Sequence, residues 1–242
     1  EVKLIESQGP ILPNPIKSIA DMSRVRVPDV HETLQYVFDA IKMIKKELNG
    51  RVPLIGFAGA PWTLLCYMVQ GKGSKTFDEA KSFCYTQPEV AHHLLQMITD
   101  TTISYLKGQI EAGADVVQIF DSWGGLWSPV DFEEFSLQYI RQIVHAVKDL
   151  APTIIFAKGA WASIGAMAET GAAGLGIDWC IPPKTAREFA GDNITLQGNF
   201  DPAKLYAPVD VIKREVKKMI TDFGPGRYIA NLGHGILPTV PV

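Results

Sequence analysis

The sequence predicts an α/β fold, a (β/α)8 barrel of the TIM type, and three observations support this prediction. Six apolar runs of strand length recur along the chain, and helical patterns separate them. None of the six alternates cleanly between apolar and polar residues, which is typical of strands buried on both faces of a parallel sheet. With 242 residues and no repeat or low-complexity segment, the chain reads as a single domain over residues 1–242.

Six runs are fewer than the eight strands of a complete barrel. We therefore expect a partial barrel, incomplete at both ends, with an early strand and the final helix outside residues 1–242. The first residue is Glu1 rather than Met, which also suggests a fragment, and a chain of these residues alone is expected to be inactive and poorly folded. A doubly wound open sheet is the alternative architecture.

The first elements follow from apolar spacing and capping residues. Apolar residues at spacings of three and four predict an amphipathic helix from Asp29 to Gly50. Val52–Gly71 reads as a strand, a turn and an apolar helix. Thr86 lies three residues before Glu89, a capping-box spacing that predicts the start of a long helix.

Strands and helices alternate through the rest of the chain. The remaining strands are predicted at Ala114–Phe120, Thr153–Ala157, Gly174–Trp179, Ile194–Phe200 and Tyr228–Leu232. The helices between them are predicted to start at Ser128 and to span Ala162–Thr170, Pro182–Ala190 and Val209–Phe223.

Composition excludes several classes of function. The 23 Lys and Arg against 26 Asp and Glu give a net charge of −3, so no basic field favours nucleic acid. No apolar run reaches the ~18 residues of a membrane span. The three cysteines, Cys66, Cys84 and Cys180, form no close metal-binding pair, which indicates a reduced, cytoplasmic protein without a cysteine zinc site.

Candidate functional residues lie where predicted strands end, because barrel enzymes place their chemistry there. Phe120 and Ser122 share one face of a strand end, as an apolar wall and a hydroxyl, while Asp121 faces the other way. Ser122 can instead cap the turn, and for Asp121 we favour a structural role. In the earlier strand Phe57 points the same way as Gly59, and the small residues Gly56 and Gly59 allow close approach of a ligand or another backbone.

Two further side chains are candidates for ligand contact. His234 stands between two glycines at the last strand end, which exposes its imidazole and favours a functional role. Tyr67 lies in the apolar helix after the first strand, where a packing role is equally plausible. Gln197 and Asn199 follow another strand, and ordinary loop hydrogen bonding is the simpler interpretation of both.

These segments together resemble the uroporphyrinogen decarboxylase family over essentially all 242 residues, in order. The motifs that carry the resemblance are PILPNPI, GFAGAPWTLLCYM, QIFDSWGG, IIFAKG, GIDW, TLQGNFDP and FGPGRYIANLGHGI.

The resemblance implies a (β/α)8 barrel, commonly a homodimer, that uses no metal or organic cofactor. It implies removal of CO2 from the four acetate side chains of uroporphyrinogen III to give coproporphyrinogen III in haem biosynthesis. By resemblance Tyr67, Ser122 and His234 contact the substrate, and Phe57 and Phe120 line the cleft.

The match also has departures. The family's catalytic aspartate and its Arg-rich N-terminal motif belong upstream of Glu1, so no residue of this chain is expected to take the catalytic role. Ala160 and Trp161 stand where many relatives carry a histidine nearby, and no function is predicted for that loop. Two rival functions stay open: a zinc-dependent corrinoid or thiol methyltransferase of the same superfamily, and a non-catalytic tetrapyrrole-binding relative.

Overall fold

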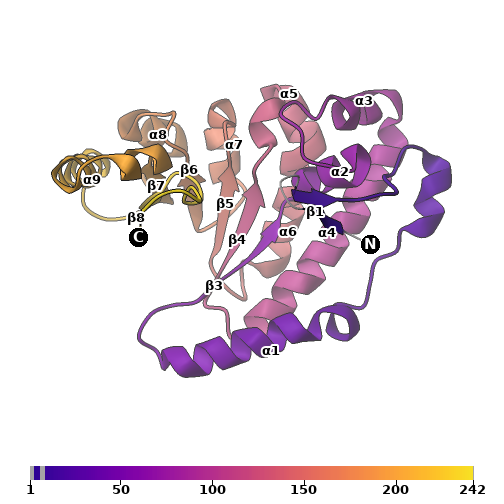
Figure 1. The fold of residues 1–242 in the computed structure, drawn as a ribbon, viewed down its shortest axis with the longest axis horizontal. Helices are drawn as coiled ribbons and strands as arrows, with labels where there is room; N and C mark the ends of the chain where they lie inside the picture. Colours follow the sequence, from indigo (N-terminus) through magenta and orange to yellow (C-terminus); the bar gives the residue numbers. More distant parts are fainter. Residues whose placement is uncertain (1–2, 6–8, 242) are drawn as a thin grey trace.

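The computed structural model describes residues 3–5 and 9–241, and its main feature is a six-stranded parallel sheet (Figure 1). The strands are β3 (Ile55–Gly59), β4 (Val116–Asp121), β5 (Thr153–Ala157), β6 (Gly174–Ile177), β7 (Thr195–Phe200) and β8 (Tyr228–Leu232). Two short strands, β1 (Lys3–Ile5) and β2 (Gly9–Ile11), form a separate antiparallel pair.

Nine α-helices lie within the described residues. They are α1 (Val30–Leu48), α2 (Pro61–Gln70), α3 (Asp78–Thr86), α4 (Pro88–Glu111), α5 (Pro129–Phe132), α6 (Gln138–Val147), α7 (Ile164–Ala168), α8 (Pro183–Ala190) and α9 (Val209–Phe223). Shorter helical turns are η1 (Ile19–Arg24), η2 (Gly124–Leu126), η3 (Glu133–Leu137, a π-helix), η4 (Trp161–Ser163) and η5 (Pro202–Tyr206). None of the helices in the described segments is long and apolar enough to cross a membrane.

The strand order decides between the two predicted architectures. The strands lie side by side in chain order, β3-β4-β5-β6-β7-β8, with every neighbouring pair parallel. A doubly wound sheet reverses its strand order at a switch point, and this sheet does not. The barrel prediction is confirmed, and within the described residues the sheet stays open, with β3 and β8 as its two edges.

Burial on both faces is correctly predicted for the central strands and wrong at the edges. Every residue of β5 and β6 is buried. In β3, however, exposed and buried residues alternate, and Phe57 is 60% exposed. An edge strand has a neighbour on one side only, so its inward side chains lack the cover that the next strand supplies in the centre.

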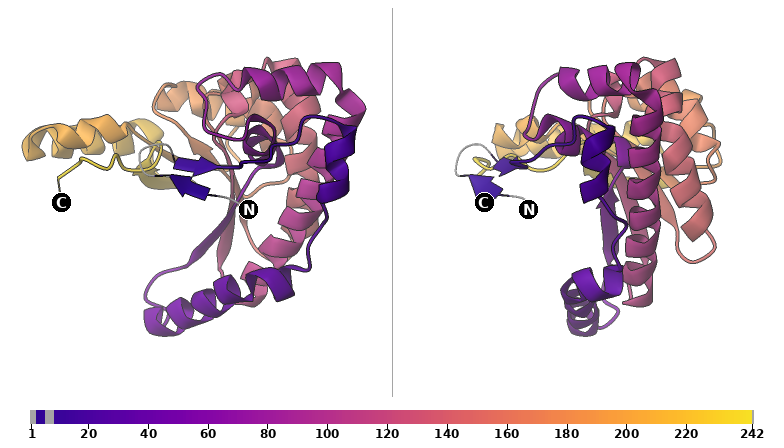
Figure 2. Two further views of the ribbon diagram at one scale, coloured as in Figure 1. Left: turned by 45° about the vertical axis from the view of Figure 1, so that its right-hand side comes forward. Right: turned by 90° about the vertical axis from the view of Figure 1, so that its right-hand side faces the viewer.

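Helices cover one face of the sheet. In the right-hand view of Figure 2, α4 runs along the sheet while β1 and β2 lie on the opposite side. The outward residues Val117 and Ile119 of β4 are fully buried in the same apolar core as Leu94 and Leu106 of α4. Because successive side chains of a strand point to opposite faces, Gln118 and Phe120 are left for the inner face.

The segment Val52–Gly71 folds as predicted, but the space at its glycines is not open to a ligand. A Cβ on Gly56 would lie 2.5 Å from Oε1 of Gln109, and a Cβ on Gly59 would lie 2.9 Å from the side chain of Leu64. Gln109 is buried and bridges β3, accepting from the Phe57 N–H and donating to its carbonyl, both at 2.9 Å. The space that these glycines leave is therefore filled by the protein's own side chains.

The predicted capping box at Thr86 is wrong. Thr86 is the last residue of α3, a helix that the sequence patterns did not reveal, and its hydroxyl donates to the Ser82 carbonyl at 2.7 Å. The long helix α4 begins at Pro88 without a side-chain cap. Two helices thus meet at a single linking residue, Gln87, whose side-chain amide donates to the Lys17 carbonyl instead.

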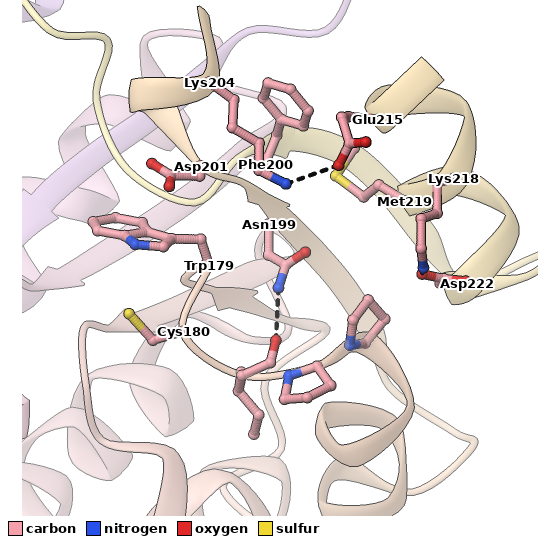
Figure 3. Close-up of a pocket in the computed structure, with 13 residues that line it drawn as sticks. Trp179, Cys180, Asn199, Phe200, Asp201, Lys204, Glu215, Lys218, Met219 and Asp222 are labelled. Atoms are coloured by element: carbon pink, nitrogen blue, oxygen red, sulfur yellow. Dashed lines mark hydrogen bonds and ion pairs between the residues drawn. The ribbon is translucent and has the colours of Figure 1, made fainter. Parts of the chain in front are cut away.

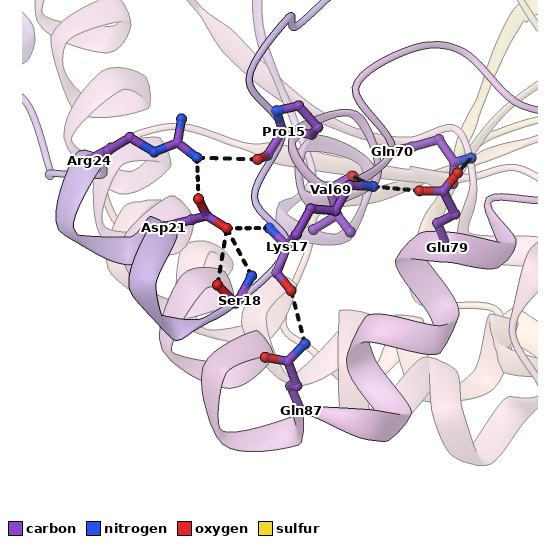
Figure 4. Close-up of polar contacts among 9 residues, drawn as sticks. All are labelled: Pro15, Lys17, Ser18, Asp21, Arg24, Val69, Gln70, Glu79 and Gln87. Atoms are coloured by element: carbon purple, nitrogen blue, oxygen red, sulfur yellow. Dashed lines mark hydrogen bonds and ion pairs between the residues drawn. The ribbon is translucent and has the colours of Figure 1, made fainter.

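A polar cluster fixes the N-terminal segment to the helices (Figure 4). The Asp21 carboxylate accepts from the Lys17 and Ser18 backbone N–H groups and from Arg24. These contacts hold the pKa of Asp21 low, at about 2. The Lys17 ammonium donates to the Val69 carbonyl at 2.7 Å, near the end of α2. This hydrogen bond links the N-terminal segment to the helices.

Replacement of Gly108 tests the packing of α1 on α4. A Cβ at Gly108 would lie 2.4 Å from the Phe38 ring, so Gly108→Ala should lower the free energy of unfolding by about 1–3 kcal/mol through overpacking. Urea unfolding measures the change. Gly73→Ala is the matched control, because no atom lies within 4 Å of the new methyl group. Equal stability of the two variants would contradict this packing.

Candidate active site

A cavity of about 460 Å³ opens on the inner face of the sheet, at the carboxyl ends of the strands. Its lining residues come from strands β4 to β8, from the segment just after β4 and from the loop after β8, and include Gln118, Phe120, Ser122, Phe156, Gln197 and His234. In parallel α/β proteins this end of the sheet is where ligands bind. The cavity is therefore the candidate active site.

A row of aromatic rings runs along the inner face of the sheet. Phe120, Phe156 and His234 line the cavity, and Phe57, on the edge strand, lies beside it and is not among the lining residues. Ring centroids are 5.9 Å apart for Phe57 and Phe120, 5.8 Å for Phe120 and Phe156, and 6.0 Å for Phe156 and His234. Each ring meets the next edge to face, an arrangement that aromatic quadrupoles favour. The row follows from strand register, because Phe120 pairs directly with Phe156 across β4 and β5.

Two buried amides of the cavity lining are hydrogen-bonded to each other. Gln197 donates to the Gln118 side-chain oxygen at 3.2 Å, and both side chains are buried. Asn199, by contrast, donates to the Asp178 and Ile181 carbonyls. Asn199 is thus occupied with loop structure, as the simpler interpretation of its sequence position predicts.

Ser122 and Tyr67 lie in different cavities. Ser122 lines the candidate active site, and its hydroxyl makes no hydrogen bond and caps no turn in the part of the chain that the structure describes. Tyr67 lines a second cavity of about 420 Å³ between α2 and α4, with its ring against Phe77. Its hydroxyl accepts a 3.3 Å hydrogen bond from Trp123, the residue after Ser122.

His234 lies at the rim of the candidate active site. Partial burial and the nearby ammonium of Lys158 lower the pKa of His234, and the Asp178 carboxylate opposes this only in part. The imidazole is therefore neutral at pH 7, with one N–H donor and one acceptor. Gly233 positions it, because its N–H donates to the Phe200 carbonyl and a Cβ there would lie 2.8 Å from the Trp179 nitrogen.

Asp121 points away from the cavity and joins three segments. Its carboxylate is fully buried and accepts hydrogen bonds of 2.6 Å from Thr63 of α2 and from Ser136 of η3. Burial raises the pKa of Asp121 to about 6, although the hydrogen bonds from Ser136 and Thr63 act in the opposite direction. These contacts agree with the structural role favoured from the sequence.

The sequence patterns predicted no role for Phe156, which lines the cavity, or for Trp161. Phe156 is the next-to-last residue of its strand, as Phe120 is of its own, and each stands two residues before a polar side chain. This similarity could have predicted from the sequence that Phe156 lines the cavity. Trp161 donates to both oxygens of the Asp178 carboxylate at 2.9 and 3.0 Å. No local pattern marks this contact, because it joins two different βα loops.

An α/β barrel with an aromatic, histidine-edged cavity at the carboxyl ends of its strands is the frame of a TIM-barrel enzyme. The family model described as uroporphyrinogen decarboxylase (URO-D) matches residues 1–242. The chain therefore belongs to the uroporphyrinogen decarboxylase family.

Individual relatives agree with this membership. A uroporphyrinogen decarboxylase of Flavobacterium johnsoniae is 58% identical over 242 residues, which cover all of this chain and 71% of that protein. The protein of that name from Homo sapiens is 47% identical and is matched over 98% of this chain and 67% of its own length. A solved structure of a methyltransferase from Methanosarcina mazei superposes with a TM-score of 0.83 at 25% identity, over all of this chain and 71% of that one.

The Asp121 carboxyl predicts a specific dependence of stability on pH. Because its pKa is raised from 3.8 to about 6, the folded state holds this proton more tightly than the unfolded state. The resulting stabilisation is complete below pH 3.8 and is lost as the pH rises through about 6, on the order of 3 kcal/mol in all.

Asp121→Asn should remove that dependence. Urea unfolding between pH 4 and pH 7 should show wild-type stability falling relative to the variant. Asp149→Asn, at an exposed position, is the control and should run parallel to the wild type. If the stability of Asp121→Asn changes with pH in the same way as that of the wild type, the pKa of Asp121 is not raised.

Proposed function

We propose that the aromatic cavity is where this chain binds uroporphyrinogen, with Ser122 and His234 contacting the substrate and Phe57 and Phe120 lining the macrocycle. As a member of its family, the protein is a decarboxylase of porphyrin biosynthesis. The single observation that supports the site is the row of rings from Phe57 through Phe120 and Phe156 to His234, beside the free hydroxyl of Ser122.

The chemistry explains why such a site suits the reaction. Loss of CO2 from an acetate side chain leaves an electron pair on the methylene carbon, and a protonated pyrrole ring beside it can accept that pair. Proton uptake at the carbon then gives a methyl group. The protein's task is to hold a flexible polyanion and to favour the protonated ring, which is a matter of positioning and electrostatics.

The side chains of the cavity suit the positioning part of this task. A neutral His234 and the Ser122 hydroxyl can each donate a hydrogen bond to a substrate carboxylate. Phenylalanine rings supply apolar surface for the macrocycle. Asp121 takes no part, because its carboxylate is buried on the other face of β4.

Tyr67 lies outside this cavity, in the one between α2 and α4. Its hydroxyl accepts from the indole of Trp123, the residue after Ser122. From the family resemblance we propose that the Tyr67 hydroxyl also donates to a substrate carboxylate.

One rival function is favoured by a specific observation, the close superposition with the methyltransferase from Methanosarcina mazei. A zinc-dependent methyltransferase needs a cluster of ligands, and no group of three or more His, Cys, Asp or Glu suited to a metal lies within residues 3–5 and 9–241. Stoichiometric zinc in an elemental analysis of the purified protein would favour the methyltransferase function. Binding of a porphyrin without turnover would favour the non-catalytic alternative.

We also propose, from the family resemblance, that the protein is cytoplasmic and acts as a homodimer. Analytical ultracentrifugation of the purified protein would show whether it is a dimer.

His234→Ala should lower kcat/KM for uroporphyrinogen about 10- to 100-fold, because a hydrogen bond to a charged carboxylate contributes roughly 1.5–3 kcal/mol. Steady-state assays with analysis of the partly decarboxylated products measure the effect. His93→Ala, on the exposed side of α4, is the control. An unchanged rate and product pattern would remove His234 from the site.

Tyr67→Phe should reduce kcat/KM about 10- to 100-fold with little change in the melting temperature. The change removes the proposed hydrogen bond to a charged carboxylate, which contributes roughly 1.5–3 kcal/mol, and keeps the ring packed on Phe77. Activity and thermal melts of the same preparation separate the two effects, and Tyr36→Phe at an exposed position is the control. Full activity of Tyr67→Phe would make Tyr67 a packing residue.

A further inference from the structure

Lys158 stands at the carboxyl end of β5, on the cavity side of the sheet. Its N–H donates to the Asp121 carbonyl at 3.1 Å and its carbonyl accepts from Gly125 at 2.9 Å, so its backbone continues the pairing with the segment after β4. Phe156, two residues earlier, lines the cavity. Since strand side chains alternate, Lys158 belongs to the same face as Phe156.

The side chain of Lys158 is half-buried and carries an unneutralised charge. Its ammonium lies 5.6 Å from the centroid of the Trp179 ring and makes no hydrogen bond or ion pair within the described part of the chain. Its charge reaches the cavity rim, because it is one of the causes that lower the pKa of His234.

Other lysines near these strand ends are already neutralised. Figure 3 shows Lys204 directed at Glu215, at 3.0 Å, and Lys218 beside Asp222, in a polar hollow of about 310 Å³ next to α9. That hollow is a poor anion site, because each ammonium in it has a carboxylate partner.

The buried carboxylate of Asp178 does not serve Lys158 either. Asp178 accepts from the Gly159 N–H at 2.7 Å, from the Cys180 N–H at 2.9 Å and from the Trp161 indole. These donors turn its oxygens toward the loops after β5 and β6. Lys158 is thus a partly exposed cation near the cavity rim that has no carboxylate partner within the described residues, so its charge is available to an anionic ligand.

We propose that Lys158 binds a carboxylate of the substrate at the rim of the aromatic cavity, next to His234. The proposal rests on the proposed location of the substrate site. The ammonium is a compact charge on a flexible stem, so it can follow carboxylates at several positions around one macrocycle. The Trp179 ring supports it in the absence of substrate.

Lys158→Met tests the proposal, because it keeps an unbranched apolar stem of similar length while removing the ammonium and its contact with Trp179. In the intact enzyme KM for uroporphyrinogen should rise about 10-fold, with a smaller change in kcat. The rise of KM with salt should be shallower than in the wild type, because one ionic contact is lost. Lys158→Arg should restore most of the affinity.

Controls separate this role from a structural one. Lys204→Met removes an ammonium that Glu215 already neutralises, and should leave KM unchanged. An unchanged KM and salt dependence in Lys158→Met, or a fall in kcat alone, would overturn carboxylate binding. If Lys158→Met fails to fold, the result for Lys158→Gln decides by the same criteria.

The His234→Ala variant distinguishes failure of this proposal from failure of the site. A raised KM in His234→Ala with an unchanged KM in Lys158→Met refutes the role of Lys158 alone. No effect of either substitution on KM places the substrate elsewhere.

Discussion

The buried carboxylate of Asp121 is the contact on which the geometry of the cavity depends. It joins the end of β4 to α2 through Thr63 and to the π-helix η3 through Ser136. A carboxylate in this position is unfavourable when charged, as its raised pKa shows. The hydrogen bonds offset part of that penalty and hold three segments in one arrangement.

The alternating side chains of β4 link this buried carboxylate to the cavity. With Asp121 directed into the helix layer, Phe120 and Ser122 necessarily face the cavity. Register then places Phe156 beside Phe120. A structural residue and the candidate binding residues are thus neighbours in sequence but lie on opposite faces of the sheet.

The charges around the cavity suit a polyanionic ligand. His234 is neutral at pH 7, and the Lys158 ammonium makes no ion pair with any residue that the structure describes. Asp178, the buried carboxylate beside them, is held by donors from the loops after β5 and β6. Within the described residues, the surface around the cavity therefore combines the Lys158 ammonium and neutral donors with apolar rings, while the Asp178 carboxylate is turned toward the loops.

The sequence by itself determined the strands, most of the helices and the family, because apolar spacing, prolines and glycines act over short stretches of chain. The helix start at Ser128 and the helix Val209–Phe223 are of this local kind, and both are confirmed. The structural role favoured for Asp121 also agrees with its contacts. The Thr86 cap failed, since the same local pattern is compatible with the end of one helix and with the start of the next.

Only the tertiary structure decided which distant segments meet. It separated Tyr67 from the cavity that Ser122 and His234 share, and it filled the space at Gly56 with Gln109. It also brought Lys158 close to His234 and the Trp179 ring, with no carboxylate paired to it among residues 3–5 and 9–241. These outcomes depend on strand register and on loops packed across the sheet, and such long-range contacts leave no periodic signal in the chain.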